Sequence, residues 1–255
     1  MNDVPSKGIT RYAAVLGAVS MHRNGLSLSE IARETGLPKG TVHRTIRALI
    51  SVGYLSEGSG HASYHIGPKL LRILHSGLDP EPINHLVQPT LETLVETFKE
   101  TAYLTKLVGV ESLPIAVLVP KGLSQAIMHP GRLMPPHAAA SAKAIAAFQE
   151  PELLDKILEQ PMVKYTQDTL TTLRDVRDHL ARVRDCGYAE CINEIDEGVM
   201  AIAVPVRLDD VGVIYSVAIC GLQARLDRLE RRTIVDALSL AAKQIAAVLR
   251  NANRT

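Results

Sequence analysis

Cysteine, net charge and long apolar runs are all scarce in this sequence. Its three cysteines, Cys186, Cys191 and Cys220, lack zinc-ligand spacing, so we expect free thiols in a reducing cytoplasm. No uninterrupted apolar segment reaches the roughly 20 residues that span a bilayer, which predicts a soluble chain without a membrane partner. A formal net charge of +1 excludes a wholly basic nucleic-acid coat protein.

Motifs of common enzyme classes are absent as well. The sequence has no Gly-x-Ser-x-Gly elbow, P-loop, His-Glu-x-x-His or Cys-x-x-Cys, and Ser141-Ala142-Lys143 lacks Ser-x-x-Lys spacing. A small-molecule enzyme that uses His137, Ser141, Lys143 or a cysteine stays open as an alternative. We expect His137 to cap a helix or to form a hydrogen bond rather than to catalyse. No cofactor and no metal ion is predicted.

Charge is unevenly distributed along the chain. Up to Arg72 there are nine Lys and Arg against four Asp and Glu, a net charge of +5, which leaves −4 for the remainder. A basic N-terminal part followed by an acidic remainder suggests that only the N-terminal part binds the phosphates of a nucleic acid.

The first helix is predicted from Ile9 onward. Its apolar positions recur at three- and four-residue steps, which is typical of one buried stripe. They are Ile9, Tyr12, Ala13, Leu16 and Val19. The run from Tyr12 to Met21 also resembles the apolar part of a signal peptide, but polar structure rather than a cleavage context follows it.

Two further helices follow in quick succession. Ser27 and Glu30 fit a capping box at the start of the second helix, and Gly36 is suited to end it. Pro38 can occupy the first turn of a third helix that runs to about Ser51. The third helix buries Val42, Ile46, Leu49 and Ile50 and presents a cationic face rich in hydrogen-bond donors. The residues on or near that face are Lys39, Thr41, His43, Arg44 and Arg47.

Two short strands are predicted after the third helix. Gly53-Tyr54-Leu55 and Tyr64-His65-Ile66 flank Glu57-Gly58-Ser59-Gly60, which is typical of a hairpin tip. A hairpin at this position is a wing, and together with the helices it indicates a winged helix-turn-helix that places its third helix in the major groove. His61 and His65 are four residues apart, but on a hairpin this spacing does not indicate a metal site.

These motifs, in this order, resemble the IclR family of bacterial transcription regulators. The resemblance rests on runs at residues 25–32, 35–44, 53–55, 64–68, 136–144, 164–166, 182–188 and 211–214, and it covers almost the whole chain. It implies a homodimer, often paired into a homotetramer, that binds a near-palindromic DNA operator. It also implies a GAF-like C-terminal domain that binds a small-molecule effector.

The resemblance and the element pattern together predict an α+β chain of three parts. These are a winged helix-turn-helix DNA-binding domain (1–68), a linker helix (69–82) and a GAF-like effector-binding and oligomerisation domain (83–255). In the last part we expect strands at 103–108, 113–119, 188–192, 199–206 and 211–220, and helices at 83–98, 138–148, 152–158, 172–186 and 229–250. Strands joined by a turn at Asp209-Asp210 must be antiparallel.

Family positions that line the effector pocket correspond here to Leu123, Ala126, Met134, Ala140, Ser141, Cys191, Val199, Ala201, Ala218 and Cys220. Sensors of small organic acids carry an acidic residue and hydroxyls where this chain has Cys191, Ala218 and Cys220. Ser141 is left as the clearest hydroxyl. We therefore expect an effector with an apolar or aromatic body, because such walls do not compensate a buried carboxylate.

The sequence thus predicts a cytoplasmic DNA-binding regulator, most simply a repressor of a catabolic operon, that is controlled by an effector. An architectural DNA-binding protein without an effector stays open as an alternative. No motif identifies the effector or the operator sequence, or indicates whether the effector releases or tightens DNA binding.

Overall fold

The computed structural model describes residues 7–22, 24–58, 63–76, 80–121, 131–209 and 211–252. Contacts divide the chain into two compact units, Met1–Gly77 and Leu78–Thr255. The three-part division at residues 68 and 82 stays a prediction. Among the described residues, no helix is both long enough and apolar enough to cross a membrane.

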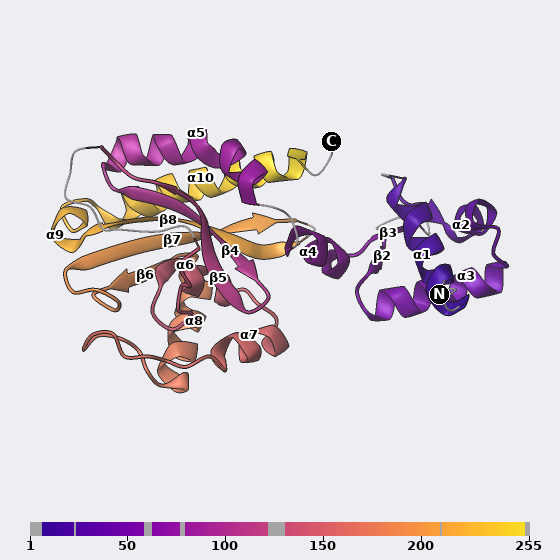
Figure 1. Cartoon of the computed structure of the whole chain (residues 1–255), viewed down its shortest axis with the longest axis horizontal. Coiled ribbons are helices and arrows are strands. Elements are labelled where there is room, and N and C mark those ends of the chain that lie inside the picture. The colour runs from indigo at the N-terminus through magenta and orange to yellow at the C-terminus, as the bar shows by residue number, and fades with distance from the viewer. Residues whose placement is uncertain are drawn as a thin grey trace, which may run out of the picture. The chain divides into compact units, whose positions relative to one another are not determined.

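The smaller unit combines helices with a short sheet (Figure 1). Its elements are α1 (Lys7–Ser20), β1 (Leu26–Ser27), α2 (Leu28–Thr35), α3 (Lys39–Ser51), β2 (Leu55–Glu57), β3 (Ser63–Ile66) and α4 (Pro68–Ser76). The three predicted helices and the second strand of the wing are confirmed, whereas the first strand, predicted at 53–55, begins only at Leu55 because Gly53 and Tyr54 form the turn that follows α3. No sequence pattern indicates β1, because a two-residue strand carries no periodicity. It pairs antiparallel with β3, and β3 pairs antiparallel with β2.

One apolar core holds the smaller unit together. Its buried residues are Val15, Val19, Leu26, Ile31, Val42, Ile46, Leu49 and Leu55. The predicted stripe on α1 is wrong in its first half, because Ile9 and Tyr12 are 66% and 41% exposed while Val15 is fully buried. A helix with apolar residues on several sides offers more than one stripe, and contacts with α2, α3 and β3 decide which is buried.

The larger unit is built on five antiparallel strands in the order β5-β4-β8-β7-β6. They are β4 (Thr101–Val108), β5 (Glu111–Leu118), β6 (Ala189–Ile192), β7 (Val199–Leu208) and β8 (Gly212–Leu222). This arrangement confirms the α+β fold class with an antiparallel sheet. Asp210, at the predicted turn between β7 and β8, lies outside the described residues.

Helices cover both faces of this sheet (Figure 1). α5 and α10 pack on one face, whereas α6 and α8 lie on the other. The helices are α5 (Pro80–Phe98), α6 (Ala140–Ala146), α7 (Pro151–Leu158), α8 (Leu173–Cys186), α9 (Gln223–Leu226) and α10 (Arg231–Ala252). α6 is shorter than the predicted 138–148, and α9 has no counterpart in the prediction. Because both faces are covered, β8 is buried from Val213 to Gly221.

Candidate functional site

The exposed face of α3 carries the cationic residues that the sequence singles out. Lys39, His43, Arg44 and Arg47 are exposed, and Thr41 is half-buried. The opposite side of the helix is held in the core by Val42, Thr45, Ile46 and Leu49. No acidic residue lies on α3, so the face presents positive charge and donors without internal neutralisation.

Local hydrogen bonds and one left-handed glycine define the two ends of α2. The backbone N–H of Ser27 donates to the Glu30 carboxylate (2.8 Å), and the Ser27 side chain accepts from the Glu30 N–H (3.4 Å). Hydrogen bonds from Ser27 also lower the pKa of Glu30. At the other end of α2, Gly36 adopts φ 67°, a conformation that glycine reaches without strain. The predicted capping box and helix end are thus confirmed, and the left-handed Gly36 turns the chain out of α2 towards α3.

The wing lies on the same compact core. Leu55 pairs with Ile66 and Glu57 with Tyr64 in the antiparallel hairpin, while the Ser63 hydroxyl lies 3.2 Å from His65 Nε2. His61 lies outside the described residues. Within the described ranges, no three His, Cys, Asp or Glu side chains are grouped so that they could hold a metal ion.

In the larger unit, strand register brings several of the predicted effector residues together. Cys191 pairs with Ala201, and Ala201 pairs with Cys220, so these three side chains form one row across β6, β7 and β8. Ala218 lies two residues from Cys220 and therefore on the same face. Val199, two residues before Ala201, is half-buried at the start of β7.

Helix α6 covers this row. The Ser216 hydroxyl on β8 donates to the backbone carbonyl of Ser141 (2.9 Å), which identifies the face of Ser216, Ala218 and Cys220 as the one that α6 packs against. Ala140 and Ser141 are buried on α6, and Met134 packs with Ala139 and Ala142. Leu123 and Ala126 lie outside the described residues, so their predicted role stays a prediction.

Neither thiol on this face is charged at neutral pH. Burial is the main cause that raises the pKa of Cys191 to about 11 and that of Cys220 to about 12. Burial also raises the pKa of Tyr103 well above its ordinary value. The side chains of Tyr103, Cys191 and Cys220 are therefore neutral.

Tyr103 also lies on this face, although no sequence pattern singles it out as an effector residue. It pairs with Ala218 on the neighbouring strand, so its side chain shares the face that α6 covers. Both Tyr103 and Ser141 are completely buried. The predicted strand at 103–108 could have identified Tyr103, because every second side chain of a strand points toward the same helix layer.

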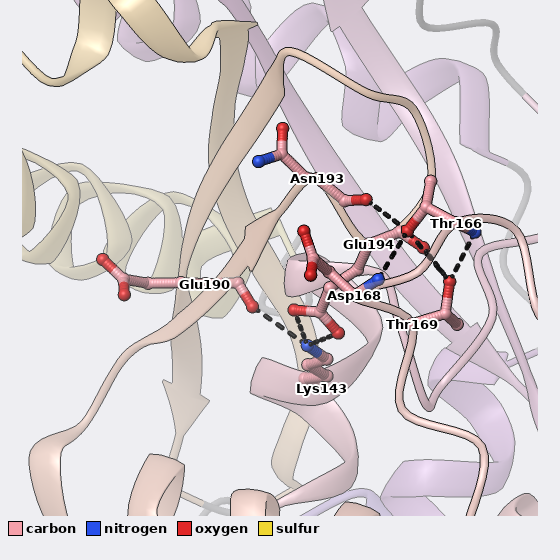
Figure 2. A network of polar contacts seen from close by, with 7 residues as sticks. All are labelled: Lys143, Thr166, Asp168, Thr169, Glu190, Asn193 and Glu194. Carbon is pink, nitrogen blue, oxygen red and sulfur yellow. Dashed lines mark hydrogen bonds and ion pairs between the residues drawn. The ribbon is translucent and has the colours of Figure 1, made fainter.

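A buried ion pair anchors α6 to the segment after β6 (Figure 2). The Lys143 ammonium donates to both carboxylate oxygens of Glu194 (2.6 Å each) and to the Glu190 carbonyl (3.1 Å). Burial lowers the pKa of Lys143 and raises that of Glu194, and each charge opposes this effect on the other. Thr169 extends the network by donating to the Glu194 carbonyl (2.7 Å). Lys143 is thus engaged in holding the domain together.

His137 forms a hydrogen bond, as the sequence analysis expects. Its Nε2 lies 2.9 Å from the Val163 carbonyl oxygen, and its ring stacks on Tyr165 with centroids 5.9 Å apart. Burial lowers the pKa of His137. These contacts connect the residues just before α6 with the segment between α7 and α8.

Comparison with known proteins places both units in one family. The model described as "IclR helix-turn-helix domain" matches residues 8–58, and that described as "Bacterial transcriptional regulator IclR C-terminal" matches residues 75–247. The DNA-binding transcriptional repressor YiaJ of Escherichia coli is 29% identical over 248 residues, 94% of this chain and 87% of YiaJ.

Two further proteins extend the comparison. The HTH-type transcriptional regulator TtgV of Pseudomonas putida is 32% identical over 212 residues, 83% of this chain and 80% of TtgV. An IclR homologue from Microbacterium hydrocarbonoxydans, crystallised with 4-hydroxybenzoate, superposes with a TM-score of 0.61 at 24% identity over 96% of this chain and 100% of that one. The superposition supports the fold.

Proposed function

Because the chain belongs to the IclR family of bacterial transcription regulators, we propose that it represses a catabolic operon in the cytoplasm and responds to an effector with an apolar or aromatic body. The chain is a DNA-binding transcription regulator with a helix-turn-helix and an effector-binding domain. The exposed cationic face of α3 is the observation that carries the DNA-binding part of this proposal.

The proposed DNA contacts follow from the chemistry of that face. Arg44, Arg47 and Lys39 bind phosphates or guanine edges, and Thr41 and His43 contact bases. One such helix reads only a few base pairs. Two DNA-binding domains related by two-fold symmetry discriminate between DNA sequences far better than one. We therefore propose a homodimer or homotetramer on a near-palindromic operator.

The proposed effector class follows from the face of the sheet that α6 covers. Cys191, Ala201, Ala218 and Cys220 present small neutral side chains there, and Ser141 and Tyr103 add hydroxyls. A carboxylate buried against such walls without a cation costs several kcal/mol. The homologue crystallised with 4-hydroxybenzoate illustrates that this fold can accommodate an aromatic compound.

Binding of effector and operator must be linked for regulation to occur. An effector changes DNA affinity only by the difference in its own affinity for the two arrangements of the protein, and the linkage is reciprocal. Calorimetric titrations of the full-length protein with phenol, glyoxylate and pyruvate test the effector class. Tight binding of glyoxylate or pyruvate without binding of the aromatic compound contradicts it.

A reporter fused to the upstream intergenic DNA tests the direction of regulation. Deletion of the gene is expected to raise reporter output, since the proposed role is repression. A fall in output identifies an activator instead. A strain that expresses the Arg44→Ala variant is expected to resemble the deletion strain, provided that the variant accumulates to the wild-type level.

A further inference from the structure

Among the residues that the structure describes, three fully buried hydroxyl groups on one side of the five-stranded sheet lie without a hydrogen-bond partner. They belong to Tyr103, Thr105 and Ser141. Folded proteins pair nearly all of their buried polar groups, because an unpaired one loses its bonds to water and gains nothing in return. Three such groups on two adjacent elements therefore call for a functional explanation.

Strand register places the three hydroxyls on the same side. Tyr103 pairs with Ala218 and Thr105 with Ser216 across β4 and β8, and paired residues face the same way. Ser216 donates to the Ser141 carbonyl, so this is the side covered by α6. The proximity of the Ser141 hydroxyl lowers the pKa of Tyr103, against the larger effect of burial, although neither hydroxyl reaches a partner with hydrogen-bond geometry.

The surroundings of these hydroxyls are small and neutral. Ala218 lies opposite Tyr103, and Cys220 lies in the next row of the same face. Lys143, on the same helix as Ser141, already donates to Glu194 and to the Glu190 carbonyl. Nearby charges act on the pKa of Cys220 in opposite directions, since the cation Arg132 lowers it and anions such as Glu100 raise it.

We propose that Tyr103 and Ser141, assisted by Thr105, hold a neutral hydroxyl group of the effector. This inference rests on the proposed function and names the chemical group that the buried end of the effector carries. A hydroxyl both donates and accepts, so it can pair with two protein hydroxyls that also do both. A carboxylate can only accept, and it would bring an uncompensated charge to a neutral wall. Tyr103 is thus a specificity-determining residue.

The first test needs no ligand. Tyr103→Phe removes an oxygen that has no partner in the ligand-free protein, so the melting temperature is expected to stay unchanged or to rise by about 2–4 °C. Ser216→Ala is the matched control, because its hydroxyl donates to the Ser141 carbonyl and its loss is expected to lower the melting temperature by about 2–4 °C. A fall in Tyr103→Phe equal to that of the control shows a structural hydrogen bond and overturns the proposal.

The second test uses phenol, anisole and benzoate as calorimetric probes of the full-length protein. Wild type is expected to bind phenol more tightly than anisole, which cannot donate, and more tightly than benzoate, which is charged. Tyr103→Phe is expected to weaken phenol binding about tenfold and to weaken anisole binding less, because anisole can accept a hydrogen bond but cannot donate one. Equal phenol affinity in variant and wild type overturns the proposal, as does a preference for benzoate.

Failure of this proposal can be separated from failure of the proposed function. A protein that binds its upstream DNA specifically but binds none of the three probes overturns the hydroxyl site and leaves the regulator standing. A protein that shows no specific DNA binding counts against the proposed function. In that case the melting temperatures of Tyr103→Phe and Ser216→Ala still decide whether the tyrosine hydroxyl is structural.

Discussion

The ammonium group of Lys143 lies 2.6 Å from both carboxylate oxygens of Glu194, and the two side chains are only 1% and 10% exposed. The pair connects α6 to the segment between β6 and β7 (Figure 2). Cys191 lies just before that segment and belongs to the row that α6 covers. The ion pair therefore fixes the position of α6 over the proposed effector-binding face.

Breaking this pair is expected to be costly. Glu194→Gln keeps the shape of the side chain but leaves the Lys143 charge buried without its partner, which typically costs about 3–5 kcal/mol. Denaturant unfolding, followed through the transition of the larger unit, measures the loss. A Glu194→Gln protein as stable as wild type contradicts the ion-pair interpretation.

A double variant provides the matched control for that experiment. Lys143→Met with Glu194→Leu removes both charges and keeps apolar volume, and such replacements are often neutral or stabilising. We therefore expect the double variant to be more stable than Glu194→Gln. The difference between the two isolates the cost of the unpaired charge from the cost of altered packing.

The capping box at the start of α2 is expected to contribute measurably to the stability of the smaller unit. Ser27→Ala removes the acceptor for the Glu30 N–H and the reciprocal contact to its carboxylate, a change that typically costs about 1 kcal/mol. Amide hydrogen exchange in α2 should report faster opening in this variant. Ser51→Ala, at the exposed C-terminal end of α3, is the control and should leave exchange in α2 unchanged. Equal exchange rates in Ser27→Ala and wild type contradict the capping role.

Stability should fall in acid partly because of His179 on α8. Burial, then the charges of Lys143 and Arg182, lower its pKa from 6.5 to about 4. Between these values the folded protein keeps His179 neutral while the unfolded chain binds a proton, so stability is lost as the pH falls from about 6.5 towards 4. At pH 4.5 the contribution is on the order of 2 kcal/mol.

Two histidine variants separate this contribution from the rest of the acid sensitivity. His179→Gln does not titrate, so its stability should decline less than that of wild type between pH 6.5 and 4.5. His85→Gln removes an exposed histidine on α5 and should follow the wild-type curve. Parallel curves for wild type and His179→Gln contradict the lowered pKa.

Local sequence patterns predict most features of the smaller unit correctly. The capping box at Ser27, the left-handed Gly36 and the exposed face of α3 each depend on neighbours within about one helical turn, so periodicity and residue type are sufficient to identify them. The stripe on α1 was predicted wrongly because several sides of that helix are apolar. Its buried side depends on tertiary contacts that no local pattern encodes.

The proposed effector-binding face was only partly predictable, since its contacts are distant in sequence. Lys143 and Glu194 are 51 residues apart, and the Ser216 hydroxyl reaches Ser141 across 75 residues. The order of the strands places β4 beside β8, which brings Tyr103 next to Ala218. Family resemblance supplied the thiols and alanines of this face, but only strand register reveals the tyrosine beside them.

DNA binding by the cationic face of α3 is tested most directly by a salt-series titration of wild type and Arg44→Ala against the upstream intergenic DNA. Arg174→Ala, an arginine of the other unit with 90% of its side chain exposed, is the matched control. Wild type and the control should bind specifically, with affinity that falls steeply as salt rises. Arg44→Ala should weaken binding by about 1–3 kcal/mol if it reads a guanine, or reduce the salt slope by about 1 if it binds a phosphate. Unchanged affinity and salt slope in Arg44→Ala, beside specific binding by wild type, contradict the assignment of this face to DNA.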